Sequence, residues 1–291
     1  MVAMPPMIEV RNLRKSFQRH RVLDGLEMDI DGGVVALLGP NGSGKTTFVS
    51  ILTTIVRPDA GSVRLLGHDA LREPRRVRSL LRVTGQAPSL DELLSGRENL
   101  VILGELLGLG GRARARADEM LERLGLEHTG RKPVRTYSGG MRRRLDLAAS
   151  LISPAPLLIL DEPTTGLDPV SRARVWEDVR ALARGGTTVL LTTQTLDEAE
   201  ALADRVMVLD RGVIVADGTV DELTALVGGR AVALVDDAGN TIETAETDGS
   251  PESVAAVLAR MRHDRPVRVE LRSPSLEDAF AALTRREEVA A

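Results

Sequence analysis

Short apolar runs separated by helical patterns predict an α/β fold for this chain. Residues 7–17, "MIEVRNLRKSF", alternate apolar and polar positions like a strand. Residues 33–38, "GVVALL", form a continuous apolar run, which is typical of a strand that is buried on both faces. From Lys45 onward the apolar residues follow helical spacing, and we expect Pro58 and Gly61 to end that helix.

The rest of the chain divides into three parts. Residues from about 97 to 150 are mostly helical in pattern and predict a helical insertion. Strand, helix and strand return in "PLLILDEP", "SRARVWEDVRALA" and "TTVLLTTQ", and this alternation predicts parallel pairing. After a change of character near residue 225, a hairpin with Gly239 and Asn240 at its turn, a helix, a strand and a last helix predict a small α+β domain. We therefore expect one domain over residues 1–225 and a second over 226–291.

Composition and charge exclude several classes of protein. With 43% hydrophobic and 27% charged residues, the 291-residue chain falls in the ordinary globular class. A net charge of −4 argues against nucleic acid as a partner. The arginine runs at 75–82 and 142–144 are each either a solvated helix face or a local anion or partner patch. Cysteine is absent and the histidines are scattered, so we expect no disulfide and no His/Cys metal site.

The same pattern bears on location. No run approaches the roughly 18 consecutive apolar residues that a membrane-spanning helix needs. The first residues lack a basic region followed by an apolar stretch, so we expect no secretion signal. A cytoplasmic location is the expectation that follows.

The strongest motif is "GPNGSGKTT", which fits the phosphate-loop pattern directly after a predicted buried strand and at the start of a helix. Glycines let backbone N–H groups surround an anion, and the helix N-terminus adds about half a positive charge. We expect Lys45 to reach the β- and γ-phosphates of a nucleotide, Thr46 to hold Mg²⁺, and Thr47 to contact the α-phosphate. The predicted nucleotide-binding residues here are Gly39, Pro40, Asn41, Gly42, Ser43, Gly44, Lys45, Thr46 and Thr47.

A pair of carboxylates supplies the second half of the predicted site. Asp161 ends the apolar run "LLILD" and is placed to bind Mg²⁺, while Glu162 can accept a proton from an attacking water. Taken alone, the two carboxylates could instead cap the segment that follows.

A third motif, "YSGGMRRRLDLAASLI", places Ser138 as a helix N-cap, with Gly139 and Gly140 leaving the helix start open to an anion. Alone it would be an ordinary capped helix. Together with the phosphate loop it resembles the signature of ABC-type ATPases, usually Leu-Ser-Gly-Gly-Gln, with Tyr137 and Met141 in place of Leu and Gln.

The resemblance covers about residues 7–225. It implies a mostly parallel sheet with an antiparallel N-terminal subdomain and the helical insertion. It also implies ATP and Mg²⁺ as cofactors, with Gln86 joining Thr46 and Asp161 as a Mg²⁺ contact. Phe17 lies where the family stacks an aromatic ring on adenine, although it could equally be a core strand residue. Asp168 matches an aspartate that crosses the interface of a face-to-face dimer, in which Ser138, Gly139 and Gly140 complete the partner's ATP site.

At residue 194 the commonest family pattern has histidine, but this sequence has glutamine. This departure, with "SPSLEDAFAALT" near the end of the chain, is similar to the branch of drug exporters typified by the daunorubicin-resistance ATPases. The resemblance implies Lys45, Glu162 and Gln194 as catalytic residues and a separate membrane-spanning permease subunit, which would hold the chain at the inner face of the membrane. Alternatively, Gln194 caps the helix "LDEAEALA" or simply faces solvent.

The leading hypothesis is therefore the ATP-hydrolysing subunit of a membrane exporter, a homodimer or heterodimer, that moves a hydrophobic drug. Related ATPases move lipids or polysaccharides, so those cargoes stay open. Three alternatives differ in class: a regulatory or repair-type ATPase without a membrane partner, a module that binds ATP but barely hydrolyses it, and a small-molecule kinase. Retention of Glu162 argues against the second, and the motif at Ser138 argues against the third.

Overall fold

The computed structural model describes residues 5–84, 90–236, 240–261 and 267–285. Contacts between residues group the chain into two units, Met1–Asp217 and Gly218–Ala291. The helix α8 (Val220–Ala225) lies on the N-terminal side of the boundary expected near residue 225, yet it groups with the second unit. The functional division at that boundary stays a prediction.

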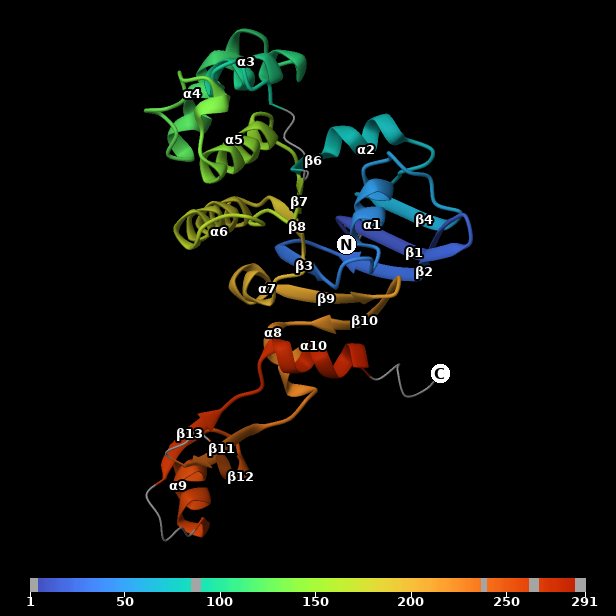
Figure 1. Cartoon of the computed structure of the whole chain (residues 1–291). Coiled ribbons are helices and arrows are strands. Elements are labelled where there is room, and N and C mark those ends of the chain that lie inside the picture. The colour runs from blue at the N-terminus through green and yellow to red at the C-terminus, as the bar shows by residue number, and fades with distance from the viewer. Residues whose placement is uncertain (1–4, 85–89, 237–239, 262–266, 286–291) are drawn as a thin grey trace. The chain divides into compact units, whose positions relative to one another are not determined.

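A six-stranded sheet forms the centre of the first unit (Figure 1). Neighbouring strands pair in parallel from β6 through β7, β8 and β3 to β9, which confirms the predicted parallel pairing. Every residue of β3, β7 and β8 is buried, and this explains their continuous apolar runs. In spatial order the strands are β10 (Val213–Gly218), β9 (Arg205–Asp210), β3 (Val34–Leu38), β8 (Thr188–Thr193), β7 (Leu157–Asp161) and β6 (Leu81–Thr84).

A second sheet is antiparallel, as the family resemblance implied. Apolar side chains alternate with polar ones along β1, and the buried set joins the core around α1 (Lys45–Leu52). The helix α2 (Pro74–Leu80) adds the buried Val77 to the same core. In spatial order the strands are β2 (His20–Ile30), β1 (Ile8–Phe17), β4 (Ala60–Leu65) and β5 (His68–Asp69).

The helix α1 ends earlier than the sequence predicted. It stops at Leu52, well before Pro58, because Thr54 adopts a left-handed conformation with φ of 65°. The backbone N–H of Thr54 then donates to Ile51 O, and that of Ile55 donates to Ser50 O, each at 2.9 Å. This is a Schellman cap, in which glycine usually holds the left-handed position, so threonine there gave no warning.

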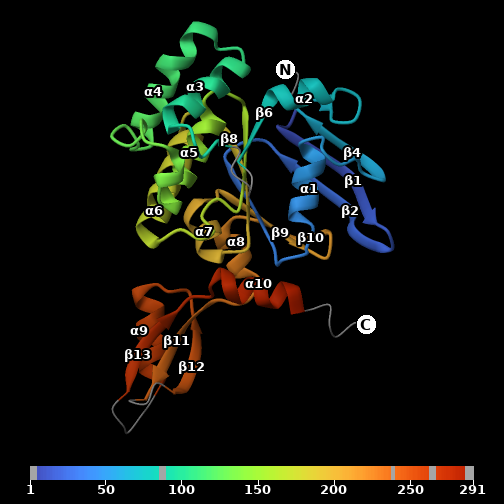
Figure 2. The ribbon, with the colours of Figure 1, turned by 45° about the horizontal axis from the view of Figure 1, so that its top comes forward.

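The helical part predicted in the middle of the chain is present as α3 (Gly96–Leu106), α4 (Ala113–Arg123) and α5 (Gly139–Leu151). Figures 1 and 2 show these helices grouped together and apart from the antiparallel strands. The buried ring of Tyr137 packs among them, and its hydroxyl donates to Thr129 O at 2.9 Å. The replacement of the usual leucine is therefore a packing residue with a satisfied hydroxyl. Two short 3₁₀ turns, Gly110–Arg112 and Val134–Thr136, connect the helices.

Two further helices follow the strands of the large sheet. The helix α6 (Pro169–Arg184) comes after β7, and α7 (Leu196–Leu202) comes after β8. Each starts within a few residues of a strand end, so both connections leave the strand's carboxyl end on the same edge of the sheet.

The second unit is α+β, as predicted. Its three-stranded antiparallel sheet has the order β12 (Thr241–Thr247), β11 (Arg230–Val235) and β13 (Arg268–Arg272). The predicted hairpin is confirmed, while its expected turn residue Gly239 lies outside the described residues. The helix α9 (Pro251–Arg260) packs on the sheet, and α10 (Leu276–Arg285) packs on α8 through buried residues.

Candidate nucleotide-binding and hydrolysis site

The carboxyl ends of three adjacent strands, β7, β8 and β3, define what we call the site edge. The phosphate loop follows β3, the carboxylate pair ends β7, and Gln194 follows β8. Two backbone hydrogen bonds join them: Gly39 N donates to Thr193 O at 3.2 Å, and Glu162 N donates to Thr192 O at 3.0 Å. The structure thus brings together segments that are more than 100 residues apart in the sequence.

The phosphate loop depends on glycine at defined positions. Gly42 and Gly44 have φ of 82° and 112°, where other residues are strained. A Cβ on Gly39 would overlap the carbonyl oxygen of Leu209, so that residue can only be glycine. Pro40, Asn41 and Gly42 are exposed at the tip of the loop, with Ser43 buried beneath it.

Two polar groups of this loop are buried. The hydroxyl of Ser43 has no hydrogen-bond partner among the described residues. The ammonium group of Lys45 donates to Gly39 O at 2.7 Å and to Pro40 O at 3.0 Å. Burial lowers the pKa of Lys45, and the nearby carboxylates of Glu162 and Asp161 oppose that shift. Thr46 is exposed and Thr47 is half-buried on the first turn of α1.

The two carboxylates have different surroundings. Asp161 is buried, and the hydroxyl of Thr192 donates to its Oδ1. Glu162 is half-buried, with φ of 48°, and its Oε2 accepts a hydrogen bond from the Thr165 hydroxyl at 3.2 Å. Neither carboxylate caps the following helix, because the N-cap of α6 is Asp168. The capping alternative is therefore wrong.

The signature residues begin α5. Ser138 is its N-cap, and its hydroxyl accepts a hydrogen bond from Met141 N at 3.2 Å. Gly139 is exposed and Gly140 is buried, and a Cβ on Gly140 would overlap the Ser171 hydroxyl.

A hollow of about 390 Å³ lies between the start of α5 and the segment after β7. Burial raises the pKa of Asp146 at this hollow to about 6, although the positive charges of Arg143 and Arg142 oppose the shift. The lining residues are Gly139, Arg142, Arg143, Asp146, Glu162, Thr165, Gly166 and Leu167.

The remaining predicted contacts are at the edges of the site. Phe17 is 48% exposed, and Lys15 Nζ lies 5.3 Å from its ring centroid, so the core-strand alternative is wrong. Asp168 accepts hydrogen bonds from Ser171 Oγ at 2.7 Å and from the backbone N–H groups of Val170 and Ser171. The bonds from Ser171 lower the pKa of Asp168. Gln86 lies outside the described residues.

Gln194 is exposed and directly follows Thr193, whose carbonyl holds the phosphate loop at Gly39. The N-cap of α7 is Thr195, so the alternative that Gln194 caps this helix is wrong. Its amide therefore stands at the site edge with its side chain open to a ligand or to solvent.

Sequence patterns gave no sign of two buried charged residues beside the site. Arg143, taken as part of a solvated run at 142–144, is half-buried and donates to the carbonyls of Asp161, Glu162 and Pro163 at 2.6–3.1 Å. Glu198 is 1% exposed and accepts from Thr164 Oγ1 at 2.6 Å. Its helical spacing from the buried Leu202 was the one available signal.

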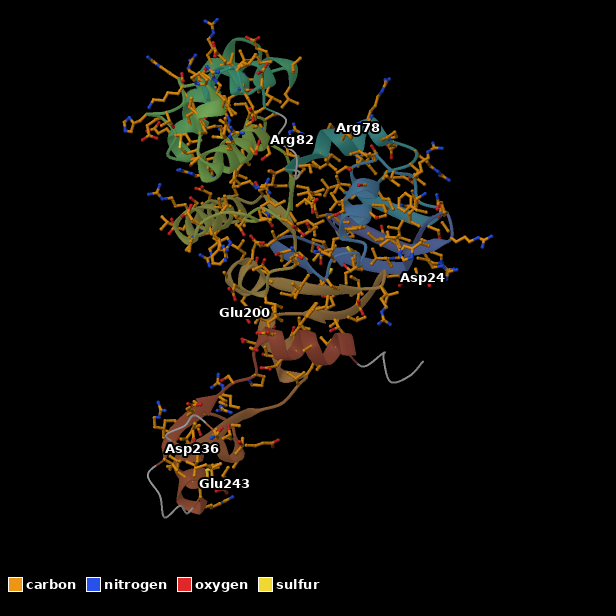
Figure 3. All side chains as sticks on the ribbon, in the orientation of Figure 1. Asp24, Arg78, Arg82, Glu200, Asp236 and Glu243 are labelled. Carbon is orange, nitrogen blue, oxygen red and sulfur yellow. The ribbon has the colours of Figure 1, made fainter. Side chains whose placement is uncertain are left out.

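The other basic run differs from the one at 142–144. Arg78 of α2 donates to Thr54 Oγ1 at 2.6 Å, and Arg82 of β6 donates to Ser153 Oγ at 3.0 Å. Figure 3 labels both side chains. Their bonds to separate parts of the fold give no support to a single anion patch.

Comparison with known proteins defines the class to which this fold and site belong. The family model described as "ABC transporter" matches residues 23–165, which include the phosphate loop, the signature and the carboxylate pair. A solved ATP-binding subunit of an ABC transporter superposes with a TM-score of 0.68 at 27% identity, over 76% of this chain and 92% of that one. Among the described residues, no helix has the length and apolar character needed to cross a membrane.

The full-length relatives narrow this class. A daunorubicin resistance ATP-binding protein of Streptomyces coeruleorubidus is 48% identical over 301 residues, covering 95% of each chain. A doxorubicin resistance ATP-binding protein of Mycobacterium tuberculosis (strain CDC 1551 / Oshkosh) is 40% identical, over 95% of this chain and 93% of its own. The chain therefore belongs to the ATP-binding subunits of ABC transporters, in the daunorubicin and doxorubicin resistance branch, and it is an ATPase of that class.

Proposed function

We propose that this chain hydrolyses ATP to drive export of a hydrophobic drug of the daunorubicin and doxorubicin type. A separate membrane-spanning subunit would carry the drug, with this chain bound at the inner face of the membrane. The carrying observation is the site edge, which holds a phosphate loop, a carboxylate pair and Gln194 on three adjacent strands. The cargo follows from relatives that match nearly the whole chain, second unit included.

The residues of the phosphate loop fit a bound nucleotide. Ser43 offers a buried hydroxyl without a partner among the described residues, and Lys45 offers an ammonium group held by two carbonyl oxygens of the loop itself. Phosphate oxygens are stronger acceptors for a buried cation than carbonyls are, because the hydrogen bond is then between opposite charges. We infer that Lys45 exchanges its carbonyl partners for the phosphates of ATP.

The donor set also fits Mg²⁺, because the Thr46 hydroxyl and the Asp161 carboxylate are hard oxygen ligands of the kind that this ion prefers. Bound Mg²⁺ would neutralise charge that develops on the phosphates. Thr192 holds the orientation of Asp161 through its hydroxyl. These residues are the proposed metal site, with Gln86 as the further ligand implied by the family.

Hydrolysis is assigned to two side chains that flank the phosphate loop. Glu162 accepts a proton from the attacking water, and its hydrogen bond with Thr165 leaves the second carboxylate oxygen for that task. The Gln194 amide donates to an oxygen of the γ-phosphate. Lys45 stabilises the negative charge on the transferred group.

A dimer follows from the single copy of each motif. In the proposed assembly, Ser138, Gly139 and Gly140 of one chain complete the ATP site of a second, and Asp168 lies at their interface. ATP would favour this closed dimer through contacts to its γ-phosphate, and hydrolysis would remove them. The second chain would be either a copy of this one or a close relative.

The test is transport of doxorubicin into inverted membrane vesicles that contain this chain and the membrane-spanning product of a neighbouring gene. We expect ATP-dependent uptake that is lost in Glu162→Gln, with Lys132→Ala, an exposed lysine elsewhere, as the control. ATP hydrolysis without doxorubicin uptake would refute the drug as cargo and favour a lipid or polysaccharide.

A further inference from the structure

The side chain of Arg143 connects the signature helix to the carboxylate pair of the same chain. From the first turns of α5, its Nε donates to Pro163 O at 2.6 Å. One terminal nitrogen donates to both Asp161 O and Glu162 O at 3.1 Å. A single guanidinium therefore binds three consecutive main-chain carbonyls at the end of β7.

The middle residue of those three has an unusual backbone. Glu162 has φ of 48°, a left-handed conformation that costs a non-glycine residue of the order of 1–3 kcal/mol and persists only where its surroundings enforce it. Its N–H is held by Thr192 O at 3.0 Å, but that bond fixes only the residue's N-terminal side. The carbonyls of Glu162 and Pro163, on the C-terminal side, are held by Arg143.

The neighbouring arginines bond elsewhere. Arg142 pairs with Glu92 at 2.5 Å, and Arg144 donates to Leu124 O at 3.1 Å. The contact with the Glu162 turn is therefore a property of Arg143 and not of the basic run. Burial lowers the pKa of Arg143, but a guanidinium stays protonated in proteins, so all its donors remain available.

We propose that Arg143 is a positioning residue for ATP hydrolysis: its guanidinium holds the left-handed turn at Glu162 and so aims the carboxylate at the attacking water. The start of α5, which carries Ser138 and Gly140, and the catalytic carboxylate are thereby fixed to each other within one chain. The inference rests on the proposed role of Glu162 as the general base.

The first test separates catalysis from binding, using the full chain with its membrane subunit. In Arg143→Ala we expect kcat to fall about 10- to 100-fold, because a shift of about 1 Å in a catalytic group can cost about 10²-fold. The KM for ATP should change by less than about 3-fold, since Arg143 bonds the turn and not the phosphate loop. Arg143→Lys, which keeps a charged donor, should recover part of kcat.

The matched control is Arg116→Ala. Arg116 donates to the carbonyls of Leu151 and Ile152 at 3.0 and 3.2 Å, so it makes the same kind of bond at the opposite end of α5. We expect its kcat to stay at the parental value. An equal loss of kcat in both variants would show a general weakening of α5 and would overturn the proposal.

The second test is a double-mutant cycle with Glu162→Gln. If Arg143 acts through Glu162, Arg143→Ala should lower the small residual rate of Glu162→Gln by less than about 2-fold. A further loss of 10-fold or more would show that Arg143 acts independently of Glu162 and would overturn the proposal.

The outcomes also distinguish the two levels of inference. Parental hydrolysis in Glu162→Gln would remove the proposed general base itself. An inactive Glu162→Gln beside an Arg143→Ala of parental kcat would leave the proposed function and overturn only the role of Arg143. If Arg143→Ala does not fold, Arg143→Lys decides: a selective loss of kcat at an unchanged Tm supports positioning, and a parental kcat refutes it.

Discussion

Gln194 lies where three segments of the site meet. Its neighbour Thr193 holds Gly39 of the phosphate loop, and Thr192 holds both carboxylate residues of β7 through its carbonyl and its hydroxyl. An exposed amide at that point can donate to a phosphate oxygen while its carbonyl accepts from water. The amide keeps the hydrogen bond that the usual histidine would make, but it cannot carry a positive charge.

We therefore expect Gln194→Ala to lower kcat by roughly 10-fold or more while ATP affinity changes by less than about 3-fold. Gln194→His should keep hydrolysis near the parental rate. Steady-state kinetics together with equilibrium ATP binding measure the two effects separately. An alanine variant with parental turnover at saturating ATP and Mg²⁺ would leave Gln194 as a solvent-facing residue.

Asp178 of α6 gives a prediction about pH. Burial raises its pKa from 3.8 to about 6, against the opposing charges of Arg123 and Arg144. Between those values the folded state holds a proton that the unfolded chain has released, so the stability contributed by Asp178 is lost as pH rises from about 4 to above 6.

Asp178→Asn keeps the neutral form at every pH. We expect this variant to gain stability relative to the parent as pH rises from about 4 to 7, as followed by urea unfolding at each pH. The neighbouring exposed carboxylate gives the control Glu177→Gln, which should show no such trend. A constant difference between Asp178→Asn and the parent would contradict the assigned burial effect.

At the scale of elements, Tyr137 stabilises the helical part. Its ring is 6% exposed and its hydroxyl donates to Thr129 O across the connection between α4 and α5. Tyr137→Phe keeps the ring but removes the donor, leaving a carbonyl without its partner. We expect a loss of about 1–2 kcal/mol in the free energy of unfolding, measured with urea.

The same substitution should leave ATP affinity unchanged, because the hydroxyl points to Thr129 and away from the anion site at Ser138 and Gly140. Thr136→Ala is a matched control, since it removes an exposed hydroxyl in the preceding turn. A Tyr137→Phe variant as stable as the parent would show that water replaces the lost donor.

The elements differ in how far the sequence could predict them. Continuous apolar runs identified β3, β7 and β8 because strands buried on both faces need apolar residues throughout. The end of α1 could not be found, because it depends on a left-handed Thr54 and not on a glycine or proline. Here a rare backbone conformation decided the boundary.

For the site, motifs predicted the residues that face the nucleotide but not those that hold them in place. The phosphate loop, Asp161 and Glu162 lie at strand ends or a helix start, positions that short sequence patterns specify. Arg143 and Glu198 act on main-chain carbonyls and hydroxyls that come from distant segments. Such contacts follow from tertiary packing, which has no local period in the sequence.

At the scale of the whole molecule, the proposed assembly depends on a competition between dimer closure and hydrolysis. One chain carries one phosphate loop and one signature, so a complete site needs two chains. Closure is favoured only while the γ-phosphate remains, because its contacts distinguish the closed state from the open one. Slowing hydrolysis without weakening ATP binding should therefore trap the dimer.

Glu162→Gln meets this condition, since it replaces the proton acceptor by a neutral group of the same shape. We expect hydrolysis to fall by about 10² or more and a dimer to accumulate with ATP and Mg²⁺, observed by size-exclusion chromatography with light scattering. Lys45→Ala in the same background should stay monomeric, because the phosphate loop then lacks the cation that binds the γ-phosphate. A monomeric Glu162→Gln at saturating ATP would contradict the face-to-face assembly, even if its hydrolysis is lost as expected.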